Sequence, residues 1–138
     1  MSWLLFAVGS AFFAGITAIL AKIGIQSVLS HLATALRTGV VLVFAWGMVF
    51  LVGSQGDLAQ LTGGDLAWLV LSGLATGASW LCYFRALQAG PASVVVPIDK
   101  LSILVTILFS SLVLKETLSR KAALGLVLIL AGTGAMLL

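Results

Sequence analysis

The chain has 138 residues, of which 62% are hydrophobic and only 8% are charged, and its mean hydropathy is +1.26. Soluble domains carry about 25% charged residues, so this composition excludes a water-facing globular surface and predicts an integral membrane protein. The formal net charge of +3 comes from basic residues that are mostly scattered singly, whereas nucleic-acid-binding proteins gather them on one face. We therefore expect no nucleic-acid partner.

Five apolar stretches follow one another along the sequence. A bilayer core about 30 Å thick needs roughly 20 helical residues, and each stretch approaches or exceeds that length. The first stretch lacks a basic start and a small-residue cleavage site, so we expect a retained helix rather than a signal peptide. The sequence predicts one all-α membrane domain over residues 1–138, a bundle of five transmembrane helices at about residues 3–24, 32–52, 66–87, 92–114 and 122–138.

The connections between these stretches carry turn and cap signals. The one sizeable loop, residues 53–65, is polar and Gly-rich and contains no basic residue. A Gly-Pro pair at 90–91 breaks the chain into a tight hairpin, and Ser119 is a predicted N-cap for the last helix. Gly125 and Gly132 align on one face of that helix, which predicts a packing surface.

The basic residues near the helix ends divide equally between the two sides of the membrane. The side richer in Lys and Arg normally stays cytoplasmic. Here each side carries three: Lys115, Arg120 and Lys121 on the side of the N-terminus, and Lys22, Arg37 and Arg85 on the other. This tie favours insertion in both orientations and an antiparallel homodimer of ten helices, like the inverted repeats of secondary transporters. Alternatively, a partner or the insertion machinery fixes one orientation.

Three segments carry a family resemblance. Residues 83–98 read YFRALQAGPASVVVPI, residues 114–119 read LKETLS, and a Gly-rich stretch runs from Gly125 to Gly132. Together they resemble the EamA domain of the drug/metabolite transporter superfamily, in its single-domain five-helix form. Where many members have Gly before the Glu of the fourth connection, this chain has Lys115.

The resemblance implies export or exchange of small organic solutes by alternating access, without naming the solute. It implies a multi-pass protein of the inner (plasma) membrane that pairs with a second copy. The expected partners are therefore the lipid bilayer, a small-molecule solute and protons as a candidate coupling ion. Two alternatives remain: a non-transporting membrane subunit and a small dual-topology channel.

Asp99 is the sharpest local signal, because it is the one acid inside a predicted span. An acid near the centre of a span costs about 2.5 to 3.5 kcal/mol on insertion scales and usually faces a cavity or a partner. Its helix carries a polar stripe at spacings of three and four that is expected to line a water-filled path: Asp99, Ser102, Thr106 and Ser110. These residues are candidates for binding solute or a coupling proton.

The neighbours of Asp99 complete the candidate site. Pro97 cannot donate a backbone hydrogen bond, so a kink is expected just before the charges. Lys100 lies about 100° around the helix from Asp99 and is not expected to pair with it. In the alternative interpretation, Asp99 and Lys100 pair with groups on other helices, with Arg37 or Arg85 as the partner of the acid, and only fix packing.

Aromatic and basic residues of other helices have two possible roles each. Trp80 and Tyr83 are candidates for stacking on a solute, although aromatic residues also occupy interfaces and cores. For Arg37 and Arg85, anchoring a helix end is the simpler role. His31 stands alone, and neither a catalytic triad nor a metal-ligand set accompanies it. We therefore expect no enzyme activity, no metal and no cofactor.

Overall fold

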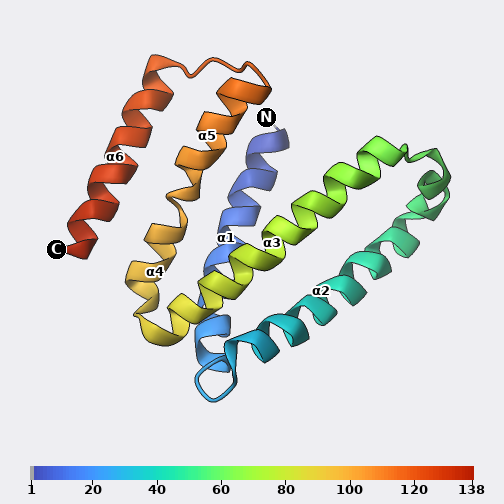
Figure 1. Cartoon of the computed structure of the whole chain (residues 1–138), viewed down its shortest axis with the longest axis horizontal. Coiled ribbons are helices and arrows are strands. Elements are labelled where there is room, and N and C mark those ends of the chain that lie inside the picture. The colour runs from blue at the N-terminus through green and yellow to red at the C-terminus, as the bar shows by residue number, and fades with distance from the viewer. Residues whose placement is uncertain (1) are drawn as a thin grey trace. The chain divides into compact units, whose positions relative to one another are not determined.

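A computed structural model describes residues 2–138 (Figure 1). Across these residues the secondary structure is helical, and five helices are long and apolar enough to cross a membrane. This confirms the predicted helix count. The spans are Ser2–Gly24, Ser30–Val52, Gly63–Ala89, Ala92–Val113 and Arg120–Leu137, each within three residues of its predicted bounds.

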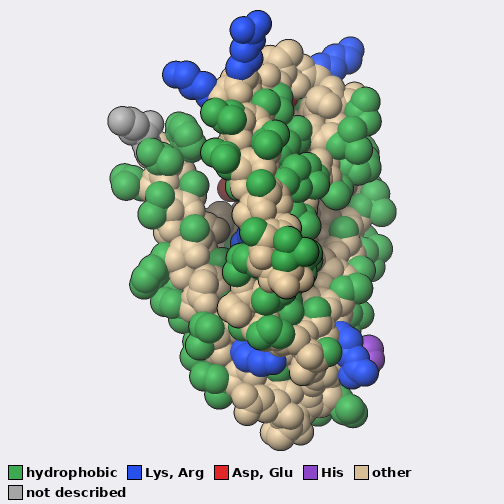
Figure 2. All heavy atoms as spheres, turned by 90° about the vertical axis from the view of Figure 1, so that its left-hand side faces the viewer, with side chains coloured by type: hydrophobic (Ala, Val, Ile, Leu, Met, Phe, Trp, Pro, Cys, Tyr) green, Lys and Arg blue, Asp and Glu red, His purple; other side chains and the backbone are tan. Residues whose placement is uncertain are grey.

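Almost all of the apolar surface is exposed. The buried hydrophobic residues among 2–138 are Ala18, Ile25, Phe84 and Leu87. Figure 2 shows apolar side chains over much of the face that it draws. A soluble protein rarely leaves so large an apolar surface uncovered, so lipid or a partner must cover these helices.

Contacts divide the chain into two compact units, residues 2–88 and 89–138. Each unit is described by itself below. That residues 1–138 form a single five-helix domain stays a prediction.

The first unit contains α1 (Ser2–Gly24), α2 (Ser30–Val52), the 3₁₀ helix η1 (Ser54–Gln60) and α3 (Gly63–Ala89). Gly53 ends α2 in the left-handed conformation, with φ 79°, and its N–H donates to Val49 O at 3.0 Å. Only glycine adopts this conformation freely. The predicted polar loop therefore holds a helical segment after a glycine cap.

A reciprocal cap starts α3. The Asp65 carboxylate accepts hydrogen bonds from Thr62 N at 3.1 Å and from Thr62 Oγ1 at 2.6 Å, and Asp65 N donates to Thr62 Oγ1 at 3.2 Å. These bonds satisfy N–H groups that the first turn of a helix leaves without partners.

The opposite end of the first unit is held by side chains that bond to backbone carbonyls. Lys22 Nζ donates to the carbonyl of Leu87, in the last turn of α3. Gln88 Nε2 donates to Ile25 O at 3.0 Å and to Val28 O at 2.5 Å, in the α1–α2 connection. The last carbonyls of a helix have no intrahelical partner, so the Lys22 bond caps α3, and the Gln88 bonds tie the end of α3 to that connection.

The second unit contains α4 (Ala92–Asp99), α5 (Ser102–Val113) and α6 (Arg120–Leu137), with α4 packed against α6. The fourth span is thus two helices separated by Lys100 and Leu101. Backbone hydrogen bonds between residues three apart cross this point, from Leu101 N to Ile98 O at 2.9 Å and from Ile103 N to Lys100 O at 3.1 Å. Pro97 stays inside α4 and the break follows Asp99; the kink expected at Pro97 stays a prediction.

The α5–α6 connection is ordered by side chains. Ser110 Oγ donates to the Glu116 carboxylate, and Ser119 Oγ accepts from Ala122 N at 3.2 Å, which confirms Ser119 as an N-cap. Lys115 has φ 55°, the left-handed region that favours glycine. This conformation is a physical reason for glycine to suit the position in similar proteins.

Candidate functional site

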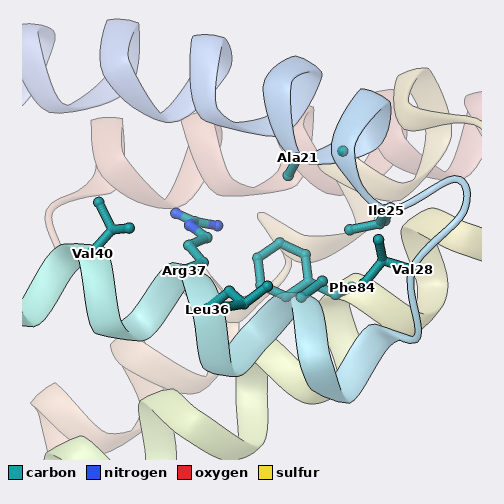
Figure 3. Close-up of a pocket in the computed structure, with 9 residues that line it drawn as sticks. Ala21, Ile25, Val28, Leu36, Arg37, Val40 and Phe84 are labelled. Atoms are coloured by element: carbon teal, nitrogen blue, oxygen red, sulfur yellow. The ribbon is translucent and has the colours of Figure 1, made fainter.

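A cavity of about 270 Å³ lies in the first unit, between the end of α1 and the first half of α2 (Figure 3). Phe84 of α3 closes one side of it. Arg37 is the one polar side chain in its lining. The lining residues are Ala21, Gly24, Ile25, Val28, Ala33, Leu36, Arg37, Val40 and Phe84.

Small residues on α1 make room for this cavity. Ala21 and Gly24 line it from α1, and a Cβ built on Gly24 would meet no atom within 4 Å. Larger side chains at these two positions would fill the space opposite α2. These two small residues therefore leave an opening in the first unit.

The Arg37 guanidinium packs over two aromatic rings of α3. Arg37 Cζ lies 4.9 Å from the centroid of the Trp80 ring and 5.1 Å from that of Phe84. Trp80 and Phe84 are four residues apart, so they share one face of the helix. Phe84 is 1% exposed, and in Figure 3 the guanidinium points from α2 toward α1. Arg37 is thus a half-buried residue that contacts two aromatic rings of α3, and its role as a helix-end anchor stays a prediction.

Within residues 2–88, no carboxylate lies near Arg37 to balance its positive charge. Among residues 2–88 the carboxylates are Asp57 and Asp65, which lie beyond the far end of α2. Arg37 is in the first half of α2, where a basic residue costs less than the roughly 2.5 to 3.5 kcal/mol of a span centre. Each cation–π contact returns about 0.5 to 1 kcal/mol when the cation is not fully desolvated. A counter-anion would stabilise the site further.

The predicted aromatic residues Trp80 and Tyr83 both belong to this surrounding. The Tyr83 ring lies 5.6 Å from the Phe84 ring, which the Arg37 guanidinium contacts. Trp80 also lines a second cavity of about 430 Å³ between α2 and α3, together with small and hydroxyl-bearing residues. These are Thr38, Ala45, Ser72, Gly73, Thr76 and Gly77, with Val41, Leu42 and Leu69 completing the lining.

In the second unit, Asp99 and Lys100 do pair. Lys100 Nζ lies 3.8 Å from Asp99 Oδ2, and the side chains are 39% (Asp99) and 60% (Lys100) exposed. The expectation that they would not pair assumed a continuous helix, in which neighbours point about 100° apart. The backbone tightens to hydrogen bonds between residues three apart at Lys100, and the long Lys100 side chain reaches the Asp99 carboxylate. Such an exposed, long contact contributes little stability.

The predicted polar stripe is divided by the structure. Thr106 Oγ1 donates to Ser102 O at 3.1 Å, and Ser110 bonds to Glu116. Thr106 and Ser110 line a cavity of about 250 Å³ with Ile107, Ser111, Glu116, Thr117 and Leu118. Asp99, Lys100, Pro97 and Ser102 lie outside that lining. Their predicted role in binding solute or protons stays a prediction.

The sequence predicts Arg37 as a helix-end anchor or as a partner of Asp99, and it does not predict the position of Arg37 at this cavity. Three signals point to this position: a basic residue within a span, the absence of an acid from the three predicted spans of residues 3–87, and two aromatic residues four apart on another helix. These three signals come together only in the folded structure. Across residues 2–138, no group of three or more His, Cys, Asp or Glu residues is placed to hold a metal ion.

Comparison with known proteins identifies relatives along the whole chain. The model of the EamA-like transporter family matches residues 1–138. A protein from Sinorhizobium sp., named "Uncharacterized transporter in cobO 3'region", is 44% identical over 131 residues, covering 95% of this chain and 93% of that protein. No solved structure matches the chain.

A second relative matches a shorter part of the chain. The protein named "Probable 4-amino-4-deoxy-L-arabinose-phosphoundecaprenol flippase subunit ArnE", from Erwinia tasmaniensis, is 38% identical over 85 residues. The match covers 59% of this chain and 79% of that protein.

Proposed function

Because the chain belongs to the EamA-like transporter family, we propose that it is a secondary transporter that exports or exchanges small organic metabolites or drugs by alternating access. In this proposal two copies insert in opposite orientations in the inner membrane and form a ten-helix unit. The solute path lies at the interface between the copies. The chain supplies binding and movement, with no catalytic step and no cofactor.

The interrupted fourth span is the observation that carries this proposal. Backbone irregularity at membrane depth is tolerated where it is buried in protein or lines a water-filled cavity, and transporter sites are typically built from discontinuous helices. Here the interruption falls at Lys100 and Leu101, directly after the acid Asp99. A charged pair at a helix break is a suitable place for a solute or a proton to bind.

The residues near the break have distinct proposed roles. Asp99 binds a cationic group or a proton, and Lys100 neutralises it when the site is empty. Pro97 has no backbone N–H to donate, so α4 has one hydrogen bond fewer and is weaker just before the break. Ser102 and Thr106 continue the polar path along α5. In the first unit, Trp80 and Tyr83 are proposed as stacking surfaces for a solute.

Pairing is supported by the exposed apolar surface and by the balance of basic residues. A single chain buries few of its large side chains, so a second copy has ample surface for contact. Three basic residues on each side leave neither orientation preferred. Both observations suit an antiparallel homodimer.

A two-stage experiment tests the transport function. The detergent-purified protein is first screened by thermal shift against amino acids, nucleobases and related metabolites, because a ligand that binds the folded state raises its apparent stability. Each stabilising compound is then tested for counterflow in proteoliposomes. Saturable exchange supports a carrier, whereas electrodiffusive ion current without saturation would indicate a channel.

A second candidate function is a subunit of a flippase. The match to the relative named as a flippase subunit favours it, because such a chain works with another protein. Copurification after expression at native level distinguishes the two functions. A transport activity that appears only when a second, different protein is added would favour the subunit role over the homodimer.

A further inference from the structure

We propose that the cavity at Arg37 binds the anionic head group of an amphiphile, a phosphate or carboxylate, with the apolar chain of that molecule directed toward the lipid. The proposal names the class of molecule that this site in the first unit binds. The role of the site in transport rests on the proposed function. Binding itself is a property of the cavity and is measured separately from transport.

The charge of the cavity selects an anion. Arg37 is the one charged side chain in the lining, and residues 2–88 place no carboxylate beside it. The rings of Trp80 and Phe84 lie against the guanidinium and hold it in place. The guanidinium offers a planar fork of N–H donors that matches a carboxylate or phosphate, and Figure 3 shows it directed toward α1 across the cavity.

The rest of the lining selects an apolar chain next to that anion. The other eight lining residues carry no polar side chain, so a fully hydrated inorganic anion would lose its water without replacement partners. The volume of about 270 Å³ is slightly below the range of pockets that enclose a drug-sized ligand. The cavity therefore holds a head group and the start of a chain rather than a whole large molecule.

The rim of the cavity leads to the surface of the helices. Leu36 is 62% exposed and Val40 is 71% exposed, both on α2. They border the cavity next to Arg37 and present apolar surface outward. An alkyl chain leaving the cavity would lie along these residues, where a membrane supplies a matching environment.

The test uses the full chain in dodecyl maltoside micelles, a neutral detergent without phosphate. Dodecyl phosphate is titrated into the micelles, and 1-dodecanol and inorganic phosphate serve as separate probes of the chain and of the anion. Binding is followed by thermal shift, and by the emission of Trp80 in a protein that carries the changes Trp3→Phe, Trp46→Phe and Trp68→Phe.

Three variants assign the binding to Arg37. Arg37→Gln should weaken dodecyl phosphate at least about tenfold, because the charge-assisted bonds are lost, and Arg37→Lys should keep the charge but lose the fork and weaken it less. Arg85→Gln removes the same charge from an exposed position outside the lining and should leave the affinity unchanged. Arg37→Lys also serves if Arg37→Gln fails to fold.

Several results would overturn the site. Equal affinity of wild type and Arg37→Gln, or of dodecyl phosphate and 1-dodecanol, would show that Arg37 does not select an anion. Tight binding of inorganic phosphate would identify a soluble anion as the ligand. Binding that appears only after Asp99→Asn would show that Asp99 is the true counter-ion of Arg37.

The proposed function can fail separately from this site. Saturable binding of dodecyl phosphate that needs Arg37, without any solute exchange in proteoliposomes, would support the site and contradict the transport function. Solute exchange that persists in Arg37→Gln, with no anion binding in wild type, would contradict the site and leave the transport function standing.

Discussion

The side-chain amide of Gln88 donates a hydrogen bond of 3.0 Å to the backbone carbonyl of Ile25. Ile25 is 3% exposed, so its carbonyl has little access to water. The same amide reaches Val28 O at 2.5 Å. Gln88 therefore fixes the α1–α2 connection, which forms one end of the Arg37 cavity, to the end of α3.

Replacing Gln88 with Leu should destabilise the protein. The change leaves two carbonyls of the connection without their donor, and a buried unsatisfied group costs about 1 to 3 kcal/mol. The measurement is the melting of the purified protein in detergent. Gln26→Leu is the control, because Gln26 is exposed; equal melting of the two variants would show that the Gln88 bonds are not structural.

Replacing Lys115 with Gly should stabilise the protein by about 1 kcal/mol, because a non-glycine residue is strained in the left-handed conformation. Lys115 has φ 55°. Chemical denaturation of matched preparations gives the difference. Lys121→Gln controls for the lost charge, and a Lys115→Gly protein that is no more stable than Lys121→Gln would show that the turn is unstrained.

Labelling of a single cysteine tests dual topology. In a Cys82→Ser background, Gln55→Cys places a thiol in the connection between α2 and α3, and an impermeant reagent should label roughly half of the copies in intact cells, in line with the charge tie.

The orientation should respond to added charge. Gln55→Lys combined with Gln60→Lys should drive the population to one orientation and remove activity, until a copy with the opposite bias is coexpressed. Complete or absent labelling in the starting protein would show that one orientation is fixed.

Replacing Gly125 with Leu should lower the dimer fraction. A Cβ at Gly125 meets no atom within 4 Å in the single chain, so the folded unit has room for a first carbon, and lost assembly would report a contact with another copy. Gly134→Leu is the control, since nine residues along a helix bring a side chain to the opposite face. Unchanged assembly of both variants, measured by cross-linking in membranes, would remove this face from the interface.

Local signals predicted the fold well. Apolar length placed all five spans, and Ser119 was recognised as a cap because its effect is confined to one helical turn. The contact between Asp99 and Lys100 was not predicted, because the sequence does not show where a proline-containing helix ends. The cluster of Arg37, Trp80 and Phe84 could not be predicted, because it depends on how α2 and α3 meet in space.

Replacing Asp99 with Asn should affect transport more than folding. Its pair with Lys100 is exposed and long, so the loss of the charge should cost little stability. A titrating carboxylate in the transport path, by contrast, is needed for binding or for proton coupling. Lys100→Gln removes the other member of the same pair and reports its structural contribution.

Counterflow in proteoliposomes tests most directly whether the chain is a carrier that uses Asp99. The solute is the compound that raises the melting temperature most in the metabolite screen, and melting is measured on the same preparations. We predict saturable exchange by wild type, and its loss or a flattened pH dependence in Asp99→Asn at near-normal melting. Absence of saturable exchange in wild type, or normal exchange by an Asp99→Asn protein that melts far earlier, would contradict the claim that the chain is a carrier that uses Asp99.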